Sequence, residues 1–268
     1  MYLSIAKKYG YLKKAQLKNQ EVKIWHSFTE RGEYQGADPS YFDVSSFDWY
    51  SILKNNTEVF KKEVLETKGE IFIPYYNRTF SNSPESWKII PLFSWLKRFD
   101  TNLAKMPKSK NILSQIPFLV SASYSQLDNS SLIKEHIGDS NVMYRVHIPL
   151  VIPAGLPECG IEVLKERREW VVGAPFAFCD AHKHRAWNNT SEKRIVLLLD
   201  IIRPEFASKT KWICAQMRSS LMLQFLFQKT KLIHKLPRFM RIFLMNFGAG
   251  IIYPFLLNQR TKTGKYLS

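Results

Sequence analysis

The sequence predicts a mainly β domain, built as an antiparallel sandwich or barrel, with flanking α-helices and a basic, apolar helical extension after it. Between about residues 116 and 204, short runs rich in β-branched and aromatic residues are separated by turn residues, as in closely spaced strands. After Glu205 the chain has no acidic residue, although eleven Lys and Arg lie among apolar stretches. Its 268 residues are enough for one domain plus an appendage.

The first forty residues are polar, basic and rich in turn formers, and they end in the run GEYQGADPS. We expect residues 1–40 to form a loosely ordered basic arm before the compact domain. The opening run MYLSIAKKYGYLKK is broken by lysines too early for a signal peptide or a membrane anchor. The three cysteines, Cys159, Cys179 and Cys214, lack the paired spacing of a disulfide framework or a zinc ribbon. These features predict a cytoplasmic protein.

Residues 41–206 are predicted to form the compact domain. Its first part contains a helical pattern over residues 48–66, followed by a connecting segment over residues 71–96. Its second part contains six runs with the composition of strands, and six short strands at this spacing predict an antiparallel sandwich or barrel. The six runs are residues 118–127, 142–153, 160–164, 168–173, 174–179 and 194–202.

Residues 207–268 form the predicted extension, which holds most of the formal net charge of +16. Its apolar stretches, 212–227 and 239–257, are interrupted by Arg, Gly and Pro. The longest nearly unbroken apolar run has sixteen residues, fewer than the roughly 18–20 of a membrane-spanning helix. Apolar helices with basic flanks fit attachment to an anionic membrane surface, whereas a nucleic-acid-binding arm would be more polar. The alternative is that these helices pack over the open side of the β domain.

Two histidines suggest a metal site. His136, in KEHIGDSN, and His184, in FCDAHKHRAWNN, each precede a predicted strand. A lone histidine on a strand is usually structural, but two imidazoles from neighbouring strands suit a ferrous ion. A carboxylate two residues after the first histidine would complete a facial triad, yet that position is Gly138, and Asp139 would point to the other face. The site would then hold water in the vacant position, or use Asp180 through that water.

Two arginines on apolar strands are also conspicuous. Arg145 and Arg194 lie in runs that are otherwise suited to a core, and a buried charge needs an anion nearby. The planar fork of an arginine matches a carboxylate in two-point contact. For Arg194 the alternative is an internal salt bridge with Asp180 or Asp200.

Over roughly residues 42–206 the chain resembles the aspartyl/asparaginyl β-hydroxylase family, a branch of the 2-oxoglutarate oxygenases that shares the missing carboxylate. The resemblance implies a double-stranded β-helix (jelly-roll) core, Fe(II), 2-oxoglutarate as cosubstrate and O2. It also implies that His136 and His184 bind the iron. It rests on seven pieces in register: Trp87 in SWKIIPLF, IPFLVSASYSQL, His136 with Gly138, YRVHIPLVIP, Trp170 with Gly173, FCDAHKHRAWNN, and RIVLLLDIIRPE.

The resemblance assigns further residues to the cosubstrate. It implies that Arg145 and His147 lie against the oxalyl end of 2-oxoglutarate, and that Arg194 and Ser125 hold its far carboxylate. For Ser125, an ordinary strand hydroxyl is nearly as good an interpretation.

Three more positions bear on the comparison with the family, namely His182, Cys179 and Glu162. His182 is placed near the substrate mouth or in solvent, because the family spacing favours the next histidine as the ligand. Cys179 and Glu162 depart from the family, which often has an acid at the first position and a basic residue at the second. These departures leave the expected iron site intact and bear on substrate contacts.

The implied activity is a dioxygenase reaction that hydroxylates an unactivated C–H bond of a peptide or lipid. The first expected target is the β-carbon of an aspartyl or asparaginyl residue. The alternative is a fatty acyl chain of lipid A, since such relatives are basic and membrane-associated, although they usually carry an N-terminal anchor. A third hypothesis is a non-catalytic membrane-binding jelly-roll protein, which would be expected to lose one of its metal or cosubstrate residues. We expect a cytoplasmic protein, peripheral on the inner face of a membrane through residues 207–268.

Overall fold

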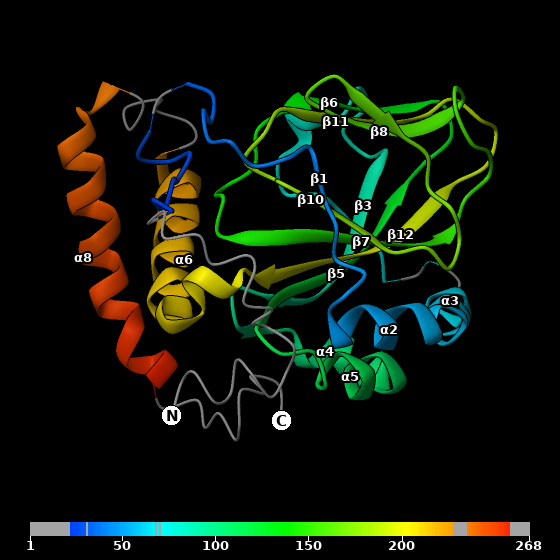
Figure 1. Cartoon of the computed structure of the whole chain (residues 1–268), viewed down its shortest axis with the longest axis horizontal. Coiled ribbons are helices and arrows are strands. Elements are labelled where there is room, and N and C mark those ends of the chain that lie inside the picture. Colours follow the sequence, from blue (N-terminus) through cyan, green and yellow to red (C-terminus); the bar gives the residue numbers. More distant parts are fainter. Residues whose placement is uncertain (1–21, 31, 68, 70, 228–234, 258–268) are drawn as a thin grey trace.

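The computed structural model describes residues 22–30, 32–67, 69, 71–227 and 235–257. Two antiparallel β-sheets face each other, with helices below the larger sheet and at one end (Figure 1). The predicted mainly β jelly-roll with flanking helices and an apolar C-terminal helix is confirmed. The strands are β1 (Tyr41–Phe42), β2 (Ile73–Pro74), β3 (Trp87–Ser94), β4 (Lys97–Arg98), β5 (Leu119–Leu127), β6 (Ser131–His136), β7 (Met143–Val151), β8 (Cys159–Val163), β9 (Glu166–Arg168), β10 (Phe176–Phe178), β11 (His184–Asn188) and β12 (Arg194–Ile202).

The larger sheet has the strand order β1-β10-β7-β12-β5-β3-β2, with β4 paired to β3, and the smaller sheet has the order β6-β11-β8-β9. Side chains alternate between the two faces along each strand, so the larger sheet supplies two layers of core. One layer packs against the helices. The other, which includes Trp87, Trp170 and Phe178, fills the space between the sheets.

Four helices cover the outer face of the larger sheet (Figure 1). The predicted helix over residues 48–66 is present but is interrupted at Asn56, so it forms two consecutive helices. Their apolar residues Leu53, Phe60 and Val64 are buried in the main core. The four are α2 (Asp48–Asn55), α3 (Thr57–Glu66), α4 (Asp100–Lys105) and α5 (Pro107–Leu113), and the short helix η1 (Arg78–Phe80) lies in the loop before β3.

The strand predictions need several corrections, among them β6, which none of the six predicted runs covers. The connecting segment expected over residues 71–96 contains β3, whose Pro91 adjoins a register shift against β5, where the missing N–H is tolerated. The run 168–173 is wrong as a strand, because β9 ends at Arg168 and the chain continues as a loop. Residues 184–188 form β11, which is short and carries polar side chains, so its composition gave no strand signal.

Residues 22–30 and 32–40 pack against the β domain, so the expectation of a loose arm is wrong for this part. The backbone N of Trp25 donates to Oδ1 of Asn141 at 2.9 Å, and Asp38 forms a 2.8 Å ion pair with Arg203. Asn141 and Arg203 are among the buried polar residues of the domain. The rest of the expected arm, residues 1–21, lies outside the described residues, and the domain boundaries at 41 and 207 stay predictions.

The C-terminal helices form a layer at one end of the sheets (Figure 1). After the short helix η2 (Pro204–Lys209), α6 (Thr210–Phe227) packs against the domain core, and α8 (Arg238–Leu257) packs on α6. A Cβ at Gly248 of α8 would overlap the side chain of Ser219, so glycine lets these helices approach closely. Within the described part of the chain, α8 is long and apolar enough to cross a membrane by length and composition alone.

Candidate active site

Five polar side chains of the larger sheet face the space between the sheets. Arg145 and His147 belong to β7, Ser125 to β5, and Arg194 and Asp200 to β12. Within each strand the paired positions have the same parity, so alternation sends them to the same face. The register places Asp200 directly opposite Arg145. The fold therefore brings together the four residues that the sequence assigned to the cosubstrate.

His136 and His184 meet across the smaller sheet as a direct pair of β6 and β11. Their presentation from neighbouring strands is confirmed, but the expectation that each precedes a strand is wrong, since they end β6 and begin β11. Between Ile133 and His136, β6 has one more residue than the facing stretch of β11. This bulge turns His136 to the same face as Ile133, and the two imidazole centroids are 4.2 Å apart.

One ring nitrogen of each of these histidines is fixed by the backbone. Nδ1 of His136 is 2.8 Å from the carbonyl oxygen of Lys134, and Nδ1 of His184 is 2.8 Å from that of His182. A carbonyl oxygen only accepts, so each Nδ1 carries the proton and each Nε2 keeps its lone pair. Burial lowers the pKa of His136 to about 4 and the pKa of His184 well below its ordinary value. Both rings are therefore neutral, the form that binds metals.

Asp180 takes the space that a side chain at position 138 would need. A Cβ at Gly138 would overlap the Asp180 carboxylate, and the backbone N of Gly138 donates to the Asp180 carbonyl at 2.8 Å. The Oδ1 atom of Asp180 lies 3.6 Å from Nε2 of His184. A carboxylate thus lies beside the histidine pair, but it comes from Asp180 and not from position 138, where a facial triad would have it. Burial raises the pKa of Asp180 to about 7, against the attraction of Arg145.

Arg145 is neutralised by two carboxylates. Its Nε and Nη2 donate to Asp200 at 2.9 and 3.1 Å, and its Nη1 donates to Asp180. Burial alone would lower the pKa of Arg145, but the two carboxylates hold that pKa well above its ordinary value. The salt bridge considered for Arg194 in the sequence is therefore formed by Arg145 instead.

Arg194 has the opposite surroundings. It is 1% exposed, and none of the described residues forms an ion pair with it. Its Nη1 donates to the carbonyl of Ser125 at 3.4 Å, its Nε has no hydrogen-bond partner, and its guanidinium lies 4.6 Å from the centroid of the Trp170 ring. Burial lowers its pKa to about 10. A buried cation with so few acceptors is costly and favours a bound anion.

Two neutral donors lie beside Arg194. Nε1 of Trp170 donates to Nδ1 of His147 at 3.1 Å, so the proton of this neutral imidazole resides on Nε2. Burial, followed by the charges of the two arginines, lowers the pKa of His147 well below its ordinary value. Nε1 of Trp87 donates to Oγ of Ser125 at 3.0 Å, which leaves the Ser125 hydroxyl proton to donate.

Three other candidate residues from the sequence, His182, Cys179 and Glu162, have side-chain partners outside the histidine pair. His182 is 4% exposed, and its Nε2 lies 2.8 Å from the carbonyl of Asp38, so the expectation of a solvent position is wrong. It fixes the N-terminal segment instead. Cys179 is buried, with Sγ 3.9 Å from the Asp38 carboxylate. Glu162 pairs with Arg167 and Arg185 on β9 and β11.

The donor set fits a metal with few protein ligands. Among the described residues, no group of three or more His, Cys, Asp and Glu has the arrangement of a metal site. Two neutral imidazoles remain, with Asp180 next to one of them and Gly138 leaving the third ligand position of a facial triad without a side chain. Nitrogen ligands with open positions suit ferrous iron, which needs room for other ligands.

A family comparison decides the assignment. The model of the family described as "Aspartyl/Asparaginyl beta-hydroxylase" matches residues 48–204, more than half of the chain. The chain belongs to the aspartyl/asparaginyl β-hydroxylase family. The resemblance stated from the sequence is confirmed, and the chain is a member of a hydroxylase family.

The chain is similar to several named proteins. It is 26% identical over 177 residues to an "Ornithine lipid ester-linked acyl 2-hydroxylase" of Rhizobium tropici, over 63% of this chain and 62% of that protein. It is 25% identical over 130 residues to the human "Aspartyl/asparaginyl beta-hydroxylase", over 47% of this chain and 17% of that protein. The chain thus spans less than two thirds of either relative. Among solved structures, a Pseudomonas putida prolyl-4-hydroxylase matches with a TM-score of 0.37 at 13% identity, over 57% of this chain and 87% of that one.

Two features of this candidate site were not predicted from the sequence. Asp200 was weighed only as a partner of Arg194, whereas it is the main partner of Arg145. Asp200 and Arg194 lie an even number of positions apart on β12, so alternation along the strand places both on the inner face. This spacing could have been read from the sequence. Trp170 was named for the family pattern alone, yet it contacts both Arg194 and His147.

Proposed function

We propose that the protein is an Fe(II)/2-oxoglutarate-dependent dioxygenase that hydroxylates an unactivated C–H bond. The observation that carries this proposal is Arg194, a buried guanidinium without a carboxylate partner among the described residues, in the same inter-sheet space as two neutral histidines. A dicarboxylate that chelates a metal at one end requires a cation at the other. A non-catalytic jelly-roll would have no reason to keep both features.

His136 and His184 would hold the iron through Nε2. When bound, the iron with 2-oxoglutarate and O2 supplies the oxidising power for hydroxylation, with succinate and carbon dioxide as the other products. Asp180 lies on the His184 side, fills the space beside Gly138 and would accept a hydrogen bond from a water bound to the metal.

The cosubstrate would lie along the larger sheet. Arg194 offers two N–H groups to the far carboxylate, and the Ser125 hydroxyl adds a third donor. Nε2–H of His147 and the guanidinium of Arg145 would lie toward the oxalyl end. Because Arg145 is already paired with Asp180 and Asp200, it would contribute hydrogen bonds there more than net charge.

Two substrate classes are proposed. The first is the acyl chain of a lipid, because the Rhizobium relative is named for acyl 2-hydroxylation and this chain exposes an apolar helix face on α8. The second is the β-carbon of an aspartyl or asparaginyl residue, because the matching family and the human relative are named for it. Basic surface charge would attract either an acidic peptide or an anionic lipid.

The test is an anaerobic titration of the full chain with Fe(II) and 2-oxoglutarate, which follows the visible charge-transfer band of the chelate. We expect the band in the wild type and its loss in His136→Ala. His26→Ala is the matched control, since His26 is also buried but only its backbone bridges Ser140 and its ring is not part of the histidine pair. A folded wild type with no band and no retained iron would contradict the proposal.

The substrate is then identified by succinate release and by mass spectrometry. Acyl lipids and Asp-containing or Asn-containing peptides are supplied in parallel, with His184→Ala as the inactive control. A product 16 Da heavier in one class only, a mass that corresponds to one added oxygen atom, selects that class. Succinate formed without either product would leave the oxygenase proposal standing and reject both substrates.

A further inference from the structure

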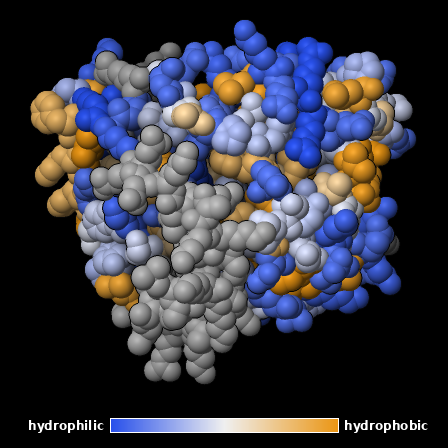
Figure 2. Space-filling model, in the orientation of Figure 1, coloured by the Kyte–Doolittle hydropathy of each residue, from blue (hydrophilic) through white to orange (hydrophobic). Residues whose placement is uncertain are grey.

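The outer side of α8 carries large apolar side chains that no part of the described protein covers. They follow one another at intervals of four residues, so they form a stripe that winds slowly along the helix. Figure 2 shows apolar surface along the edge where Figure 1 places α8. The stripe consists of Phe239, Phe243, Phe247, Ile251 and Phe255, which are 70, 64, 62, 57 and 71% exposed.

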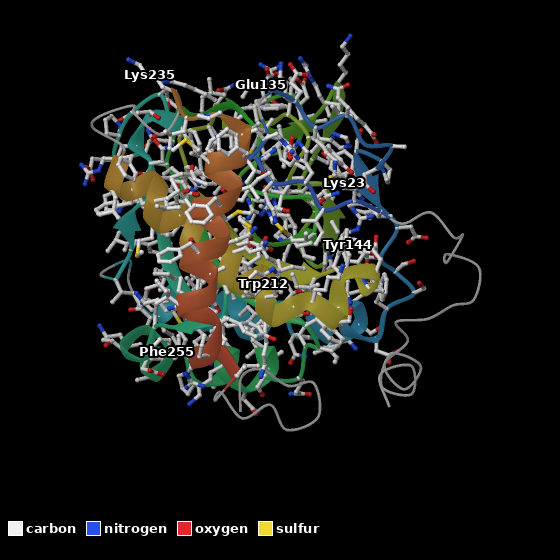
Figure 3. All side chains as sticks on the ribbon, turned by 90° about the vertical axis from the view of Figure 1, so that its left-hand side faces the viewer. Lys23, Glu135, Tyr144, Trp212, Lys235 and Phe255 are labelled. Atoms are coloured by element: carbon white, nitrogen blue, oxygen red, sulfur yellow. The ribbon has the colours of Figure 1, made fainter. Side chains whose placement is uncertain are left out.

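The inner side of α8 is fixed to the protein along its length. Near its start, Arg241 is buried and donates to the carbonyl of Phe28 at 2.9 Å. In its middle, Asn246 accepts a 2.8 Å hydrogen bond from Gln216 of α6. Near its end, Leu256 is fully buried. Figure 3 looks onto α8 and shows rings projecting outward between Lys235 and Phe255.

The charged side chains of the C-terminal helices themselves have one sign. The sequence has no acidic residue after Glu205, so neither α6 nor α8 carries a carboxylate side chain. Lys235, at the start of this helical region, is exposed. An apolar helix face with basic residues and no acids complements an interface with acyl chains below and anionic headgroups above.

We propose that the protein docks on an anionic lipid bilayer through the exposed stripe of α8, with the helix lying in the plane of the interface. A spanning arrangement would require α8 to leave Phe28 and α6 or to draw the buried Arg241 contact into hydrocarbon, which is costly. A second copy of this chain is a poorer occupant, because it would bring a second basic layer against the first. This docking does not depend on the proposed catalytic chemistry.

The segment before the β domain links α8 to the metal-site loop. Arg238 of α8 pairs with Glu30 through two donors, one of them at 2.9 Å. Three residues earlier, the backbone N of Ser27 donates to the carbonyl of Asp139 at 3.0 Å, and Asp139 follows His136 by three positions. Docking of α8 would therefore hold the β domain in one orientation over the bilayer. The loop that follows His136 would keep a fixed position relative to the membrane surface.

The test is co-sedimentation of the full chain with vesicles of phosphatidylcholine mixed with phosphatidylglycerol, and with phosphatidylcholine alone. We expect binding to the anionic vesicles that weakens as salt is raised. The double variant Phe243→Glu/Phe247→Glu should bind at least about tenfold more weakly, since two aromatic side chains lose their burial. The control is Leu65→Glu/Ile73→Glu, which alters two exposed apolar residues (45 and 52%) that lie outside α6 and α8.

Two further measurements distinguish a loss of docking from a loss of folding or of the metal site. The thermal unfolding midpoint and the Fe(II)–2-oxoglutarate band of each variant are measured beside the vesicle assay, and both should match the wild type. Wild-type chain that stays in the supernatant would overturn the proposal. Equal binding by the double variant and the control would overturn it as well. So would a soluble dimer that dissociates in the double variant, since the stripe would then be a contact between copies.

Discussion

The two arginines of the inter-sheet space lie in opposite surroundings. Around Arg145, Asp180 and Asp200 supply more negative charge than the guanidinium neutralises. Around Arg194, the described residues supply one long contact to a carbonyl and the face of Trp170. Both arginines lie on the same face of the same sheet, Arg145 with its side chain 18% exposed and Arg194 fully buried, and the carboxylates contact only the first.

This difference indicates which arginine has its charge satisfied by the protein and which needs a ligand. A guanidinium between two carboxylates is satisfied in the empty site, and its removal leaves buried anions. A guanidinium with an unbonded Nε gives up stability in the empty site and recovers it when a carboxylate binds. The surplus negative charge near Arg145 also suits a nearby divalent cation, while Arg194 suits the far end of a dicarboxylate.

The largest expected effect is on stability when Arg145 is replaced. Arg145→Met should lower the free energy of unfolding by about 3–5 kcal/mol, because Asp180 and Asp200 are left buried without their cation. Chemical denaturation of the metal-free protein at neutral pH measures this loss. The loss should shrink toward acidic pH, since burial already raises the pKa of Asp180 and its protonated form needs no partner.

A surface pair provides the control for this prediction. Lys88 and Asp128 form a 2.7 Å ion pair with side chains 29 and 26% exposed, and Lys88→Met should cost less than about 1 kcal/mol. If Arg145→Met costs no more than Lys88→Met, then the carboxylates around Arg145 do not depend on it and the comparison fails.

The same substitution at Arg194 should act in the other direction. Arg194→Met should leave the metal-free protein unchanged or stabilise it by up to about 2 kcal/mol, because an unpaired buried charge is removed at the expense of one cation–π contact. Its affinity for 2-oxoglutarate should fall by about a hundredfold, since charge-assisted hydrogen bonds to a carboxylate are lost. Isothermal titration of the Fe(II)-loaded protein measures the affinity. Unchanged affinity would assign Arg194 to another ligand.

The face occupied by each strand residue could be predicted from the sequence, but the pairing could not. Period-two alternation places Arg194 and Asp200 together on the inner face of β12. Which of them faces Arg145 depends on the register between β12 and β7, and a shift along the strand would exchange their partners. The sequence therefore suggested Asp200 as a partner for the wrong arginine.

The histidine pair shows the same limit from another cause. The two metal-ligand candidates were identified from the sequence, but the bulge that turns His136 inward is one extra residue in β6 and leaves no mark in composition. The short strand β11 was missed because its five residues, HRAWN, have the composition of a loop. By contrast, the apolar pattern of residues 239–257 predicted α8, since twenty residues give a strong signal.

Ser125 tests the Arg194 side of the comparison on a smaller scale. Ser125→Ala leaves Nε1 of the buried Trp87 without its acceptor, so it should cost about 1–2 kcal/mol of unfolding free energy. Ser123→Ala, on the same face of the same strand, is the control and should change stability by less than about 0.5 kcal/mol. If both variants bind 2-oxoglutarate as the wild type does, the Ser125 hydroxyl is structural and Arg194 holds the far carboxylate without it.

The smallest expected effect concerns His147, whose pKa depends on the charges of both arginines. Burial first, then Arg194, then Arg145 lower the pKa of His147 well below its ordinary value. The stability linked to this neutral ring is fully present above the unfolded-state pKa of about 6.5 and is lost as pH falls below it. Arg194→Met removes one of the two cations, so the pKa of His147 should rise and the acid-induced loss should become smaller. Thermal unfolding of the metal-free protein across this pH range measures the difference. The control is Arg185→Met, whose partner Glu162 lies on β8 outside the site, and it should keep the wild-type profile. If Arg194→Met gives the same profile as this control, the Arg194 guanidinium does not affect the pKa of His147.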